Sequence, residues 1–316
     1  MKIIVTGSSG FIGFNISKRL LELENEVIGI DIENQYYDVG LKLARRKILE
    51  KHKNFQFHKL DISKIDDISG LFDQQIDLVI HMAAQAGVRE SNKLFNQYCN
   101  SNILGFSNIL NLSKTNNIKN FIYASSSSVY SGNRIPFSES CTDIQPNSFY
   151  GVTKKINEDI AKFFSDSSFR TIGLRFFTVY GPYGRPDMAY YNFTKKLKSK
   201  SYINLFDKGL MVRDMTYIDD VTDSIISCIE YFDKKKFDFE VFNIGGGEKI
   251  KTIDLLNRIA NHYNITPKIL FKNSSNETKK TESCLKKSHI MLGYKPKVNL
   301  NKGLKNFYDW FDNFYR

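Results

Sequence analysis

The sequence predicts an α/β fold in which a doubly wound parallel sheet is joined to a smaller C-terminal lobe. Two observations carry this prediction. Apolar, β-branched runs alternate with segments of helical periodicity, and this alternation becomes irregular after Gly181. Strands that alternate with helices pair in parallel, because each helix returns the chain to the same edge of the sheet. The expected strands cover residues 3–5, 27–30, 55–57, 78–80, 121–123 and 171–174.

The other elements follow from the same patterns. Helical periodicity is clearest at residues 14–23 and 103–114, and a helical tail ends near Trp310. A strand-like run at residues 241–244 precedes three glycines, and we expect it to return from the lobe to the main sheet. The predicted division is a larger domain of residues 1–177 plus about 212–245 and a lobe of residues 178–211 plus 246–316.

Composition and charge restrict the class of protein. The chain has 316 residues and is 41% hydrophobic, enough for a substantial core. It has no run of about 18 apolar residues, and its start, MKIIVTG, does not read as a leader. We therefore expect a soluble, cytoplasmic protein without a membrane partner. The four cysteines lack a CxxC pair and the five histidines lack ligand spacing, so no metal site is expected.

The formal net charge of +11 raises the question of an anionic partner. The lysines are spread over many segments, and no nucleic-acid module is recognisable. We expect no nucleic-acid partner, since an anionic small substrate accounts for the same excess of positive charge.

A glycine-rich loop follows the first expected strand and opens a helix. Its glycines allow the backbone to approach a pyrophosphate, which the helix N-terminal amides bind. Asp31 ends the second strand, where a carboxylate binds the adenosine ribose and repels a 2′-phosphate. The pattern predicts a Rossmann-type domain that binds NAD rather than NADP. The expected contacts are Gly7, Gly10, Phe11, Ile12, Gly13 and Asp31.

Tyr150 and Lys154 form a YxxxK pair on a helix expected to begin after Ser148. Residues four apart share a helical face, so the lysine lies near the phenol and is expected to lower its pKa. Upstream, residues 124–130 read ASSSSVY and place four hydroxyl groups, and no acid, at the end of a strand. These side chains are candidates for proton transfer and substrate contact.

Together these motifs resemble the extended short-chain dehydrogenase/reductase superfamily, over nearly the whole chain. The resemblance implies that Ser126, Tyr150 and Lys154 are catalytic, and that Tyr150 and Lys154 also contact the cofactor. It makes Asp61-Ile62 the adenine-contacting pair and Ala83-Ala84 the cofactor turn after the fourth strand. Asn102 matches the helix asparagine of the family's YxxxNxxG pattern, here Tyr98 to Gly105, and is expected to bind the cofactor.

Longer stretches are similar to UDP-glucuronate 4-epimerases. These are AAQAGVR from Ala83, RFFTVYGP from Arg175, GRPDMA from Gly184 and RDMTYIDD from Arg213. The resemblance makes Arg185 the clamp for the sugar carboxylate, Arg213 a ligand of the UDP diphosphate, and Thr178 a contact near the substrate. Arg89 is a candidate near the sugar. The larger domain then binds NAD and the lobe binds the UDP-sugar.

The serines distinguish an epimerase from related enzymes. Sugar-nucleotide 4,6-dehydratases carry Asp-Glu at the positions of Ser127 and Ser128, and UDP-glucuronate decarboxylases carry Glu at the position of Ser128. Hydroxyl groups bind a carboxylate but transfer almost no protons near neutral pH, so they suit an enzyme that oxidises and re-reduces one carbon. We therefore expect NAD-dependent epimerisation at C4 of a UDP-uronic acid, with Ser127 and Ser128 as substrate contacts.

Several alternatives stay open. One is UDP-glucuronate decarboxylation. Another is 4-epimerisation of UDP-glucose, of a UDP-N-acetylhexosamine or of its uronic acid. A third is a cofactor-loaded binding protein. Two departures from the family pattern are residues 276–284, which lack the usual Gly-Asp-Val segment, and Ile32, which replaces an asparagine. Helices at about 91–115 and 149–166 resemble those that pair in dimers of this superfamily, so a homodimer is expected.

Overall fold

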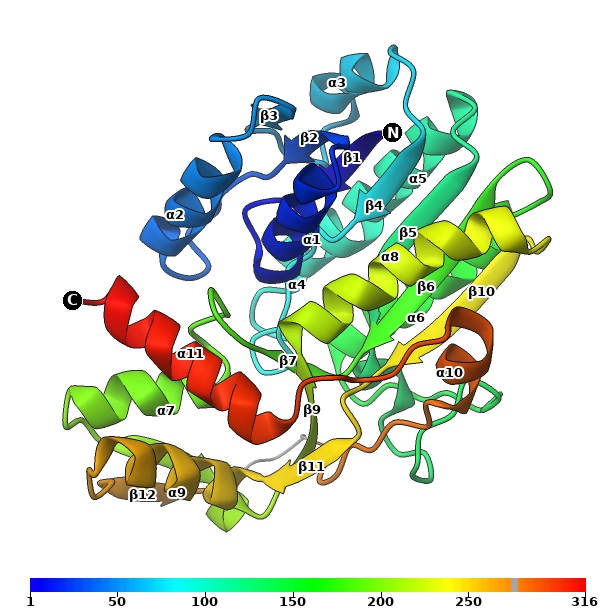
Figure 1. Ribbon diagram of the computed structural model, residues 1–316. Helices are drawn as coiled ribbons and strands as arrows, with labels where there is room; N and C mark the ends of the chain where they lie inside the picture. The colour runs from blue at the N-terminus through cyan, green and yellow to red at the C-terminus, as the bar shows by residue number, and fades with distance from the viewer. Residues whose placement is uncertain (274–277) are drawn as a thin grey trace.

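The computed structural model describes residues 1–273 and 278–316. Its centre is a seven-stranded sheet in the order β10-β6-β5-β4-β1-β2-β3, and all its strand pairs are parallel (Figure 1). Strand order reverses next to β1, because β2 pairs on one side of it and β4 on the other. The strands are β1 (Lys2–Thr6), β2 (Glu26–Ile30), β3 (Phe55–His58), β4 (Leu78–His81), β5 (Asn120–Ser126), β6 (Arg170–Phe176) and β10 (Phe239–Ile244).

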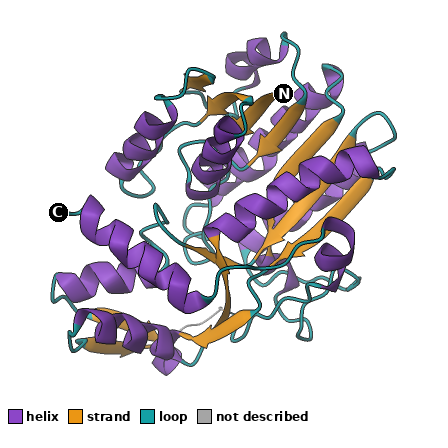
Figure 2. Cartoon of the chain, viewed as in Figure 1, coloured by secondary structure: helices purple, strands orange, loops and turns teal. Residues whose placement is uncertain are grey.

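Helices cover both faces of this sheet (Figures 1 and 2). One face carries α1 (Phe11–Glu22), α2 (Val39–Leu49) and α8 (Ile218–Lys234). The other carries α5 (Gly105–Thr115) and α6 (Phe149–Phe164), with α3 (Ile65–Ile68) and the 3-10 turn η1 (Ser69–Phe72) near the edge. The doubly wound α/β fold predicted from the sequence is confirmed, as is the return of residues 241–244 to the main sheet.

Burial explains why the apolar runs form central strands. All four residues of β4 are buried, and so are Ile3, Ile4 and Val5 in β1, because helices cover both sides. The helix that carries Tyr150 begins where predicted, since the Ser148 hydroxyl caps it by accepting a hydrogen bond from the Gly151 amide at 3.1 Å.

The segment before α5 is irregular. Helix α4 (Phe95–Tyr98) leads into the π-helical turn η2 (Cys99–Leu104), which continues as α5. A π-helical turn shifts the register of the following side chains and often occurs near functional sites. β5 runs into the 3-10 turn η3 (Ser127–Tyr130), so the serine run lies at the carboxyl end of a central strand.

The smaller lobe has its own strands. β7 (Thr178–Tyr180), β9 (Val212–Tyr217) and β11 (Glu248–Lys251) form one sheet, and β8 (Ile203–Phe206) pairs with β12 (Ile269–Lys272) in another. The 3-10 turn η4 (Asp207–Gly209) follows β8. The predicted boundary differs here, since residues 212–217 were assigned to the larger domain but pair with strands of the lobe. Cross-strand hydrogen bonding from distant residues decided this, and no local pattern reveals it.

Aromatic packing holds the lobe together. Helix α11 (Leu300–Phe314) lies along α7 (Ala189–Lys198). The centre of the Phe307 ring lies 4.8 Å from that of Tyr190 and 5.6 Å from that of Tyr191. The predicted helical tail is therefore present and extends beyond Trp310. The lobe is completed by α9 (Thr252–Tyr263), while α10 (Lys286–Leu292) packs against α8 and β10. Among the described residues, no helix combines the length and apolarity needed to cross a membrane.

Candidate active site

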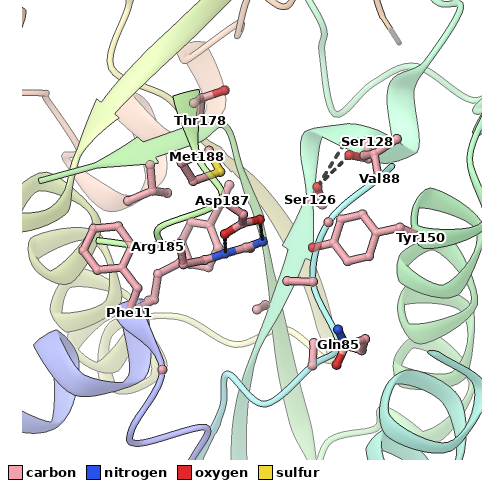
Figure 3. Close-up of a pocket in the computed structure, with 18 of the residues that line it drawn as sticks. Phe11, Gln85, Val88, Ser126, Ser128, Tyr150, Thr178, Arg185, Asp187 and Met188 are labelled. Carbon is pink, nitrogen blue, oxygen red and sulfur yellow. Dashed lines mark hydrogen bonds and ion pairs between the residues drawn. The ribbon is translucent and has the colours of Figure 1, made fainter. Parts of the chain in front are cut away.

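A cavity of about 700 Å³ lies between the carboxyl ends of the central strands and the lobe. The point at which strand order reverses in a parallel sheet is where such folds bind ligands. Residues from the glycine loop, from the turn after β4, from the end of β5 and from α6 line one side. Arg185, Met188 and Thr178 approach from the lobe side (Figure 3).

The glycine loop is built for close approach of the backbone. Gly7 has a φ of +72°, and a Cβ there would lie 2.8 Å from the backbone nitrogen of Ala83. A Cβ at Gly13 would lie 2.0 Å from the Gly7 carbonyl oxygen. Glycine is therefore required at both positions. The backbone at the start of α1 is left open to the cavity, as binding of a pyrophosphate requires.

Asp31 lies at the cavity wall and is held by the loop. Its carboxylate accepts hydrogen bonds from the Ser9 amide at 3.1 Å and from the Glu33 amide at 2.7 Å. Asp31 therefore also fixes the glycine loop against the end of β2, a role that the sequence did not indicate. Ile32, the unusual neighbour of Asp31, lines the same wall.

The adenosine end predicted at residues 61–62 also lines the cavity, with the Asp61 carboxylate oriented by hydrogen bonds from the Ser63 amide and hydroxyl. Gln85 adds a buried side-chain Nε2 that has no hydrogen-bond partner among the described residues (Figure 3). A buried donor without a partner, beside a glycine cradle, fits a polar ligand such as a dinucleotide. Ala83 and Ala84 line the cavity between the glycine loop and Gln85.

Asn102 differs from its predicted role. Its side chain accepts a hydrogen bond from the Gln85 amide at 2.7 Å and donates to the Gln85 carbonyl and the Thr153 hydroxyl at 3.0 Å each. The residue is buried behind the wall that the described residues form around the cavity. Asn102 therefore supports the turn after β4, because the π-helical turn directs its side chain to that backbone.

Tyr150, Lys154 and Ser126 come together at one wall of the cavity. Tyr150 and Lys154 lie one turn apart on α6, and the Lys154 ammonium donates a hydrogen bond to the Ala124 carbonyl at 2.9 Å. The Ser126 hydroxyl accepts from the Ser128 amide and donates to the Ser128 hydroxyl, both at 3.1 Å. Figure 3 shows the Tyr150 hydroxyl directed at the cavity beside Ser126.

Burial has the largest effect on the pKa values of Tyr150 and Lys154. Burial raises the pKa of Tyr150, while the Arg185 charge and a hydrogen bond with Ser126 lower it. Lys154 is not among these causes, so the predicted lowering by the lysine is not what the free chain displays. Burial lowers the pKa of Lys154 itself to about 8, and the Glu158 carboxylate acts in the opposite direction.

Arg185 extends from the opposite wall toward Tyr150 and Ser126 (Figure 3). Its guanidinium is bound by Asp187, with Nε to Oδ1 at 3.1 Å and Nη2 to Oδ2 at 2.6 Å. Ser127, Ser128 and Thr178 line the same part of the cavity. A cation facing hydroxyl groups is an arrangement that binds a carboxylate.

Of the other two predicted arginines, Arg213 lies on β9 of the lobe, and Arg89 lies in the segment between β4 and α4 and contacts the lobe. Arg213 donates to the Thr278 carbonyl at 2.9 Å, and the Arg89 guanidinium lies 4.4 Å from the centre of the Phe206 ring. Both line the cavity. Of the departing segment 276–284, residues 276 and 277 lie outside the described residues, while Thr278 and Thr281 line the cavity next to Arg213. This segment therefore contributes to the wall despite its unusual sequence.

Sequence reasoning missed several residues of the wall. Asp187 lies two positions after Arg185, and its charge could have identified it as a partner. The loop between β2 and α2 contributes Asn34, Tyr36 and Tyr37, and α2 contributes Lys42; none of them carries a recognised motif. Apolar residues of the lobe, such as Phe193 and Leu205, reach the cavity only through tertiary packing. Within the described residues, no group of three or more His, Cys, Asp and Glu side chains is arranged to hold a metal.

Comparison with known proteins agrees with this geometry. Residues 3–245 match the model of the NAD dependent epimerase/dehydratase family. The chain belongs to that family. The expectation of an NAD-dependent enzyme from this family is therefore confirmed.

Individual relatives narrow the resemblance. An uncharacterised protein of Methanocaldococcus jannaschii is 45% identical over 98% of this chain and 95% of its own. A UDP-glucuronate 4-epimerase of Thermodesulfobacterium geofontis is 35% identical over 97% of this chain and 95% of its own. The crystal structure of UDP-glucuronic acid 4-epimerase from Bacillus cereus, in complex with UDP-glucuronic acid and NAD, is 35% identical and covers both chains completely with a TM-score of 0.94. The predicted resemblance to UDP-glucuronate 4-epimerases is confirmed.

Proposed function

We propose that this epimerase/dehydratase family member interconverts UDP-glucuronate and UDP-galacturonate by NAD-dependent epimerisation at C4. The observation that carries the proposal is that Arg185 extends across the cavity toward the Tyr150 and Ser126 hydroxyls. A carboxylate at C5 of the sugar, bound by that guanidinium, brings the neighbouring C4 hydroxyl to Tyr150. A neutral hexose offers no such anchor.

Tyr150 is the proposed base. As phenolate it accepts the proton of the C4 hydroxyl, and it returns this proton when the 4-keto sugar is reduced from its other face. Ser126 bridges the C4 oxygen and the phenol, while Lys154 contacts the nicotinamide ribose. NAD, when bound, would accept the hydride that leaves C4 and return it. Gly7, Gly10, Phe11, Ile12, Gly13 and Asp31 would hold its pyrophosphate and ribose, with Asp61, Ile62, Ala83 and Ala84 along the rest of the molecule.

The substrate contacts divide by function. Arg213 lines the cavity and would bind the UDP diphosphate, and Arg89, which also lines it, is a candidate contact near the sugar. Arg185, Thr178, Ser127 and Ser128 surround the uronate. Firm binding of UDP with weaker contacts to the sugar permits the 4-keto sugar to rotate and present its other face to the cofactor. On this proposal the main-sheet domain binds NAD and the lobe binds UDP.

Decarboxylation of UDP-glucuronate is the nearest alternative. Both reactions begin with oxidation at C4, but decarboxylases of the same superfamily carry a glutamate at the position of Ser128. The hydroxyl groups at 126, 127 and 128 therefore favour epimerisation. Mass spectrometry of the product from UDP-glucuronate distinguishes the two, because the epimer keeps the substrate mass and the decarboxylation product lacks CO2.

Substitution of Arg185 tests the substrate class. Loss of a buried guanidinium–carboxylate contact costs roughly 2 to 5 kcal/mol, or about 30-fold to several thousand-fold in kcat/KM. We expect Arg185→Ala to lose that much on UDP-glucuronate, while any activity on UDP-glucose persists or rises. Steady-state kinetics on both substrates, at matched pH and salt, provides the measurement. An equal proportional loss on both would make Arg185 a structural or UDP-binding residue and would remove the support for a uronate substrate.

The assembly and compartment are also part of the proposal. Large apolar side chains are exposed along α4, η2 and α6, with Phe95 50%, Leu104 48% and Phe163 83% exposed. Such a face supports a homodimer that pairs these helices across a two-fold axis. The four cysteines are free thiols, which fits the reducing cytoplasm.

A further inference from the structure

Arg45 is a buried cation that neither the motifs nor the proposed chemistry use. It lies on α2 with no exposed surface, and its five N–H groups match five hydrogen bonds. The acceptors of these bonds are carbonyl and hydroxyl oxygens rather than a carboxylate. Burying a guanidinium without a counter-ion is costly, so full satisfaction of its donors is a condition for keeping it there.

The carbonyl acceptors belong to two parts of the active site. Nη1 donates to the Ser9 carbonyl and to the Tyr37 hydroxyl, both at 2.8 Å. Nε and Nη2 donate to the Tyr183 carbonyl at 3.1 and 2.7 Å, and Nη2 also donates to the Gly184 carbonyl at 3.1 Å. Ser9 is in the glycine loop, whereas Tyr183 and Gly184 directly precede Arg185. One planar group therefore joins two segments that are far apart in the sequence.

The backbone that Arg45 holds is unusual. Tyr183 has a φ of +58°, a conformation that a bulky residue adopts only when its surroundings enforce it. Its ring packs 5.1 Å from Phe14 on α1 and 4.9 Å from Trp310 on α11. At Gly184, a Cβ would lie 1.7 Å from the Tyr190 hydroxyl oxygen. The segment has one tightly defined path, and Arg45 supplies the hydrogen bonds along it.

We propose that Arg45 is a positioning residue that couples the glycine loop to the carboxylate clamp, so that selectivity for a uronate depends on Arg45 through Arg185. This inference rests on the proposed function. Displacement of the Tyr183 and Gly184 carbonyls moves the Cα of Arg185, and a long side chain carries that error to its guanidinium. Because Arg45 also binds the Ser9 carbonyl, the clamp keeps its place relative to the loop that binds NAD.

The neighbouring Arg46 is a matched control. It lies on the same helix but is partly exposed, and its charge is paired with Glu33 and Glu50 at 3.4 Å each. Arg45→Lys is the informative variant, because an ammonium keeps the charge but has three N–H groups at one point. It cannot serve the loop and the Tyr183 segment together. Arg46→Lys keeps the positive charge that pairs with Glu33 and Glu50.

Calorimetry on the NAD-loaded enzyme measures the dissociation constants of UDP-glucuronate, UDP-glucose and UDP. We expect Arg45→Lys to lower the preference for UDP-glucuronate over UDP-glucose by about tenfold to a hundredfold, the effect of a displacement near 1 Å. UDP binding should stay as in the wild type, and Arg46→Lys should retain the preference. In an Arg185→Ala background, Arg45→Lys should cause no further loss of preference.

A second measurement does not depend on the substrate. Hydrogen exchange of the amides at residues 183–188 should accelerate in Arg45→Lys and not in Arg46→Lys. Unchanged exchange, retained preference, or equal weakening of all three ligands would overturn the proposal, the last by indicating a general structural role. If the wild type itself bound UDP-glucuronate and UDP-glucose equally, the proposed function would fail instead, and the exchange result would still decide whether Arg45 holds the segment.

Discussion

Asp187 binds one edge of the Arg185 guanidinium. The bonds use Nε and Nη2, and within the described residues Nη1 carries no hydrogen bond. On the proposed function, the substrate carboxylate therefore approaches the other edge of a guanidinium that is already partly neutralised. Asp187 orients the clamp and at the same time reduces its attraction for an anion. Weaker binding of the carboxylate by Arg185 suits an enzyme whose intermediate has to rotate within the site.

The Asp187→Asn variant separates these two effects, because asparagine keeps an oxygen for Nε and removes the charge. We expect UDP-glucuronate to bind about threefold to thirtyfold more tightly, since the site loses one nearby negative charge. UDP-glucose should bind as before. Calorimetry gives both constants, and Asp159→Asn, at an exposed position on α6, is the control. Weaker binding of UDP-glucuronate would mean that Asp187 contributes orientation alone.

In the proposed mechanism, Tyr150 is the residue on which turnover depends most directly. Tyr150→Phe should abolish epimerisation while NAD and UDP still bind, because the ring packs unchanged and only the proton acceptor is lost. The control is Tyr123→Phe on β5, since the buried Tyr123 hydroxyl has no hydrogen-bond partner among the described residues. That variant should keep turnover. Wild-type rates in Tyr150→Phe would exclude Tyr150 as the base.

Helix α6 shows how one element organises the site. Tyr150, Lys154 and Glu158 follow one another at four-residue spacing, so they share a face that packs against β5. Glu158 accepts hydrogen bonds from Ser125 at 2.6 Å and from Arg175 at 2.8 and 2.7 Å. Its charge favours the ammonium form of Lys154. A single helix thus carries the base, its neighbouring cation and the anion behind that cation.

The depressed pKa of Lys154 predicts a pH dependence of stability. Burial lowers this pKa from 10.5 to about 8. Between these values the unfolded chain retains a proton that the folded chain has released. The free energy of unfolding therefore rises with pH across this window, and below pH 8 the cost of burying the charge is fully present. The free energy of unfolding of the wild type minus that of Lys154→Met should thus rise by roughly 3 kcal/mol from about pH 7 to about pH 10.5.

Urea unfolding of both proteins without NAD, at several pH values, measures this difference. Lys155→Met on the same helix is the control, because the Lys155 ammonium is near the surface and pairs with Asp159. The difference in free energy of unfolding between Lys155→Met and the wild type should stay nearly constant with pH. A constant difference for Lys154→Met as well would mean that Lys154 keeps its proton in the folded protein at pH 10.

For the whole molecule, the exposed apolar face on α4, η2 and α6 is the main feature that the monomer leaves unexplained. Phe163 is 83% exposed on α6, and the Phe95 ring stacks 4.4 Å from Phe149. Both lie on the helices that cover the side of the sheet opposite α1 and α8 (Figure 1). Contact between two copies through this face would cover these rings.

We expect light scattering to give the mass of a dimer for the wild type and that of a monomer for a Phe95→Glu, Phe163→Glu double variant, because four buried carboxylates oppose association. Phe271→Glu is the control, since Phe271 is 64% exposed on β12 in the lobe. It should remain a dimer. A wild type that stays monomeric at high concentration would contradict the assembly.

Local sequence patterns were sufficient for the central fold and for much of the site. Most strands of the main sheet are short apolar runs whose central residues are buried, so their identity does not depend on their partners. The glycine loop and the YxxxK pair are similarly local, because a turn at Gly7 and a helical face at Tyr150 and Lys154 involve only nearby residues. The family and its cofactor followed from these motifs.

The relations between distant segments were decided by the tertiary structure. Arg45 and the Tyr183 carbonyl are 138 residues apart in sequence, and no periodicity relates them. Strand β9 joined the lobe through pairing with β7 and β11, and Asn102 turned to Gln85 rather than to the cavity. The physical reason is the range of the interactions. Periodicity and turn chemistry act between neighbours in the chain, whereas buried hydrogen bonds and ion pairs form only after packing has brought their partners together.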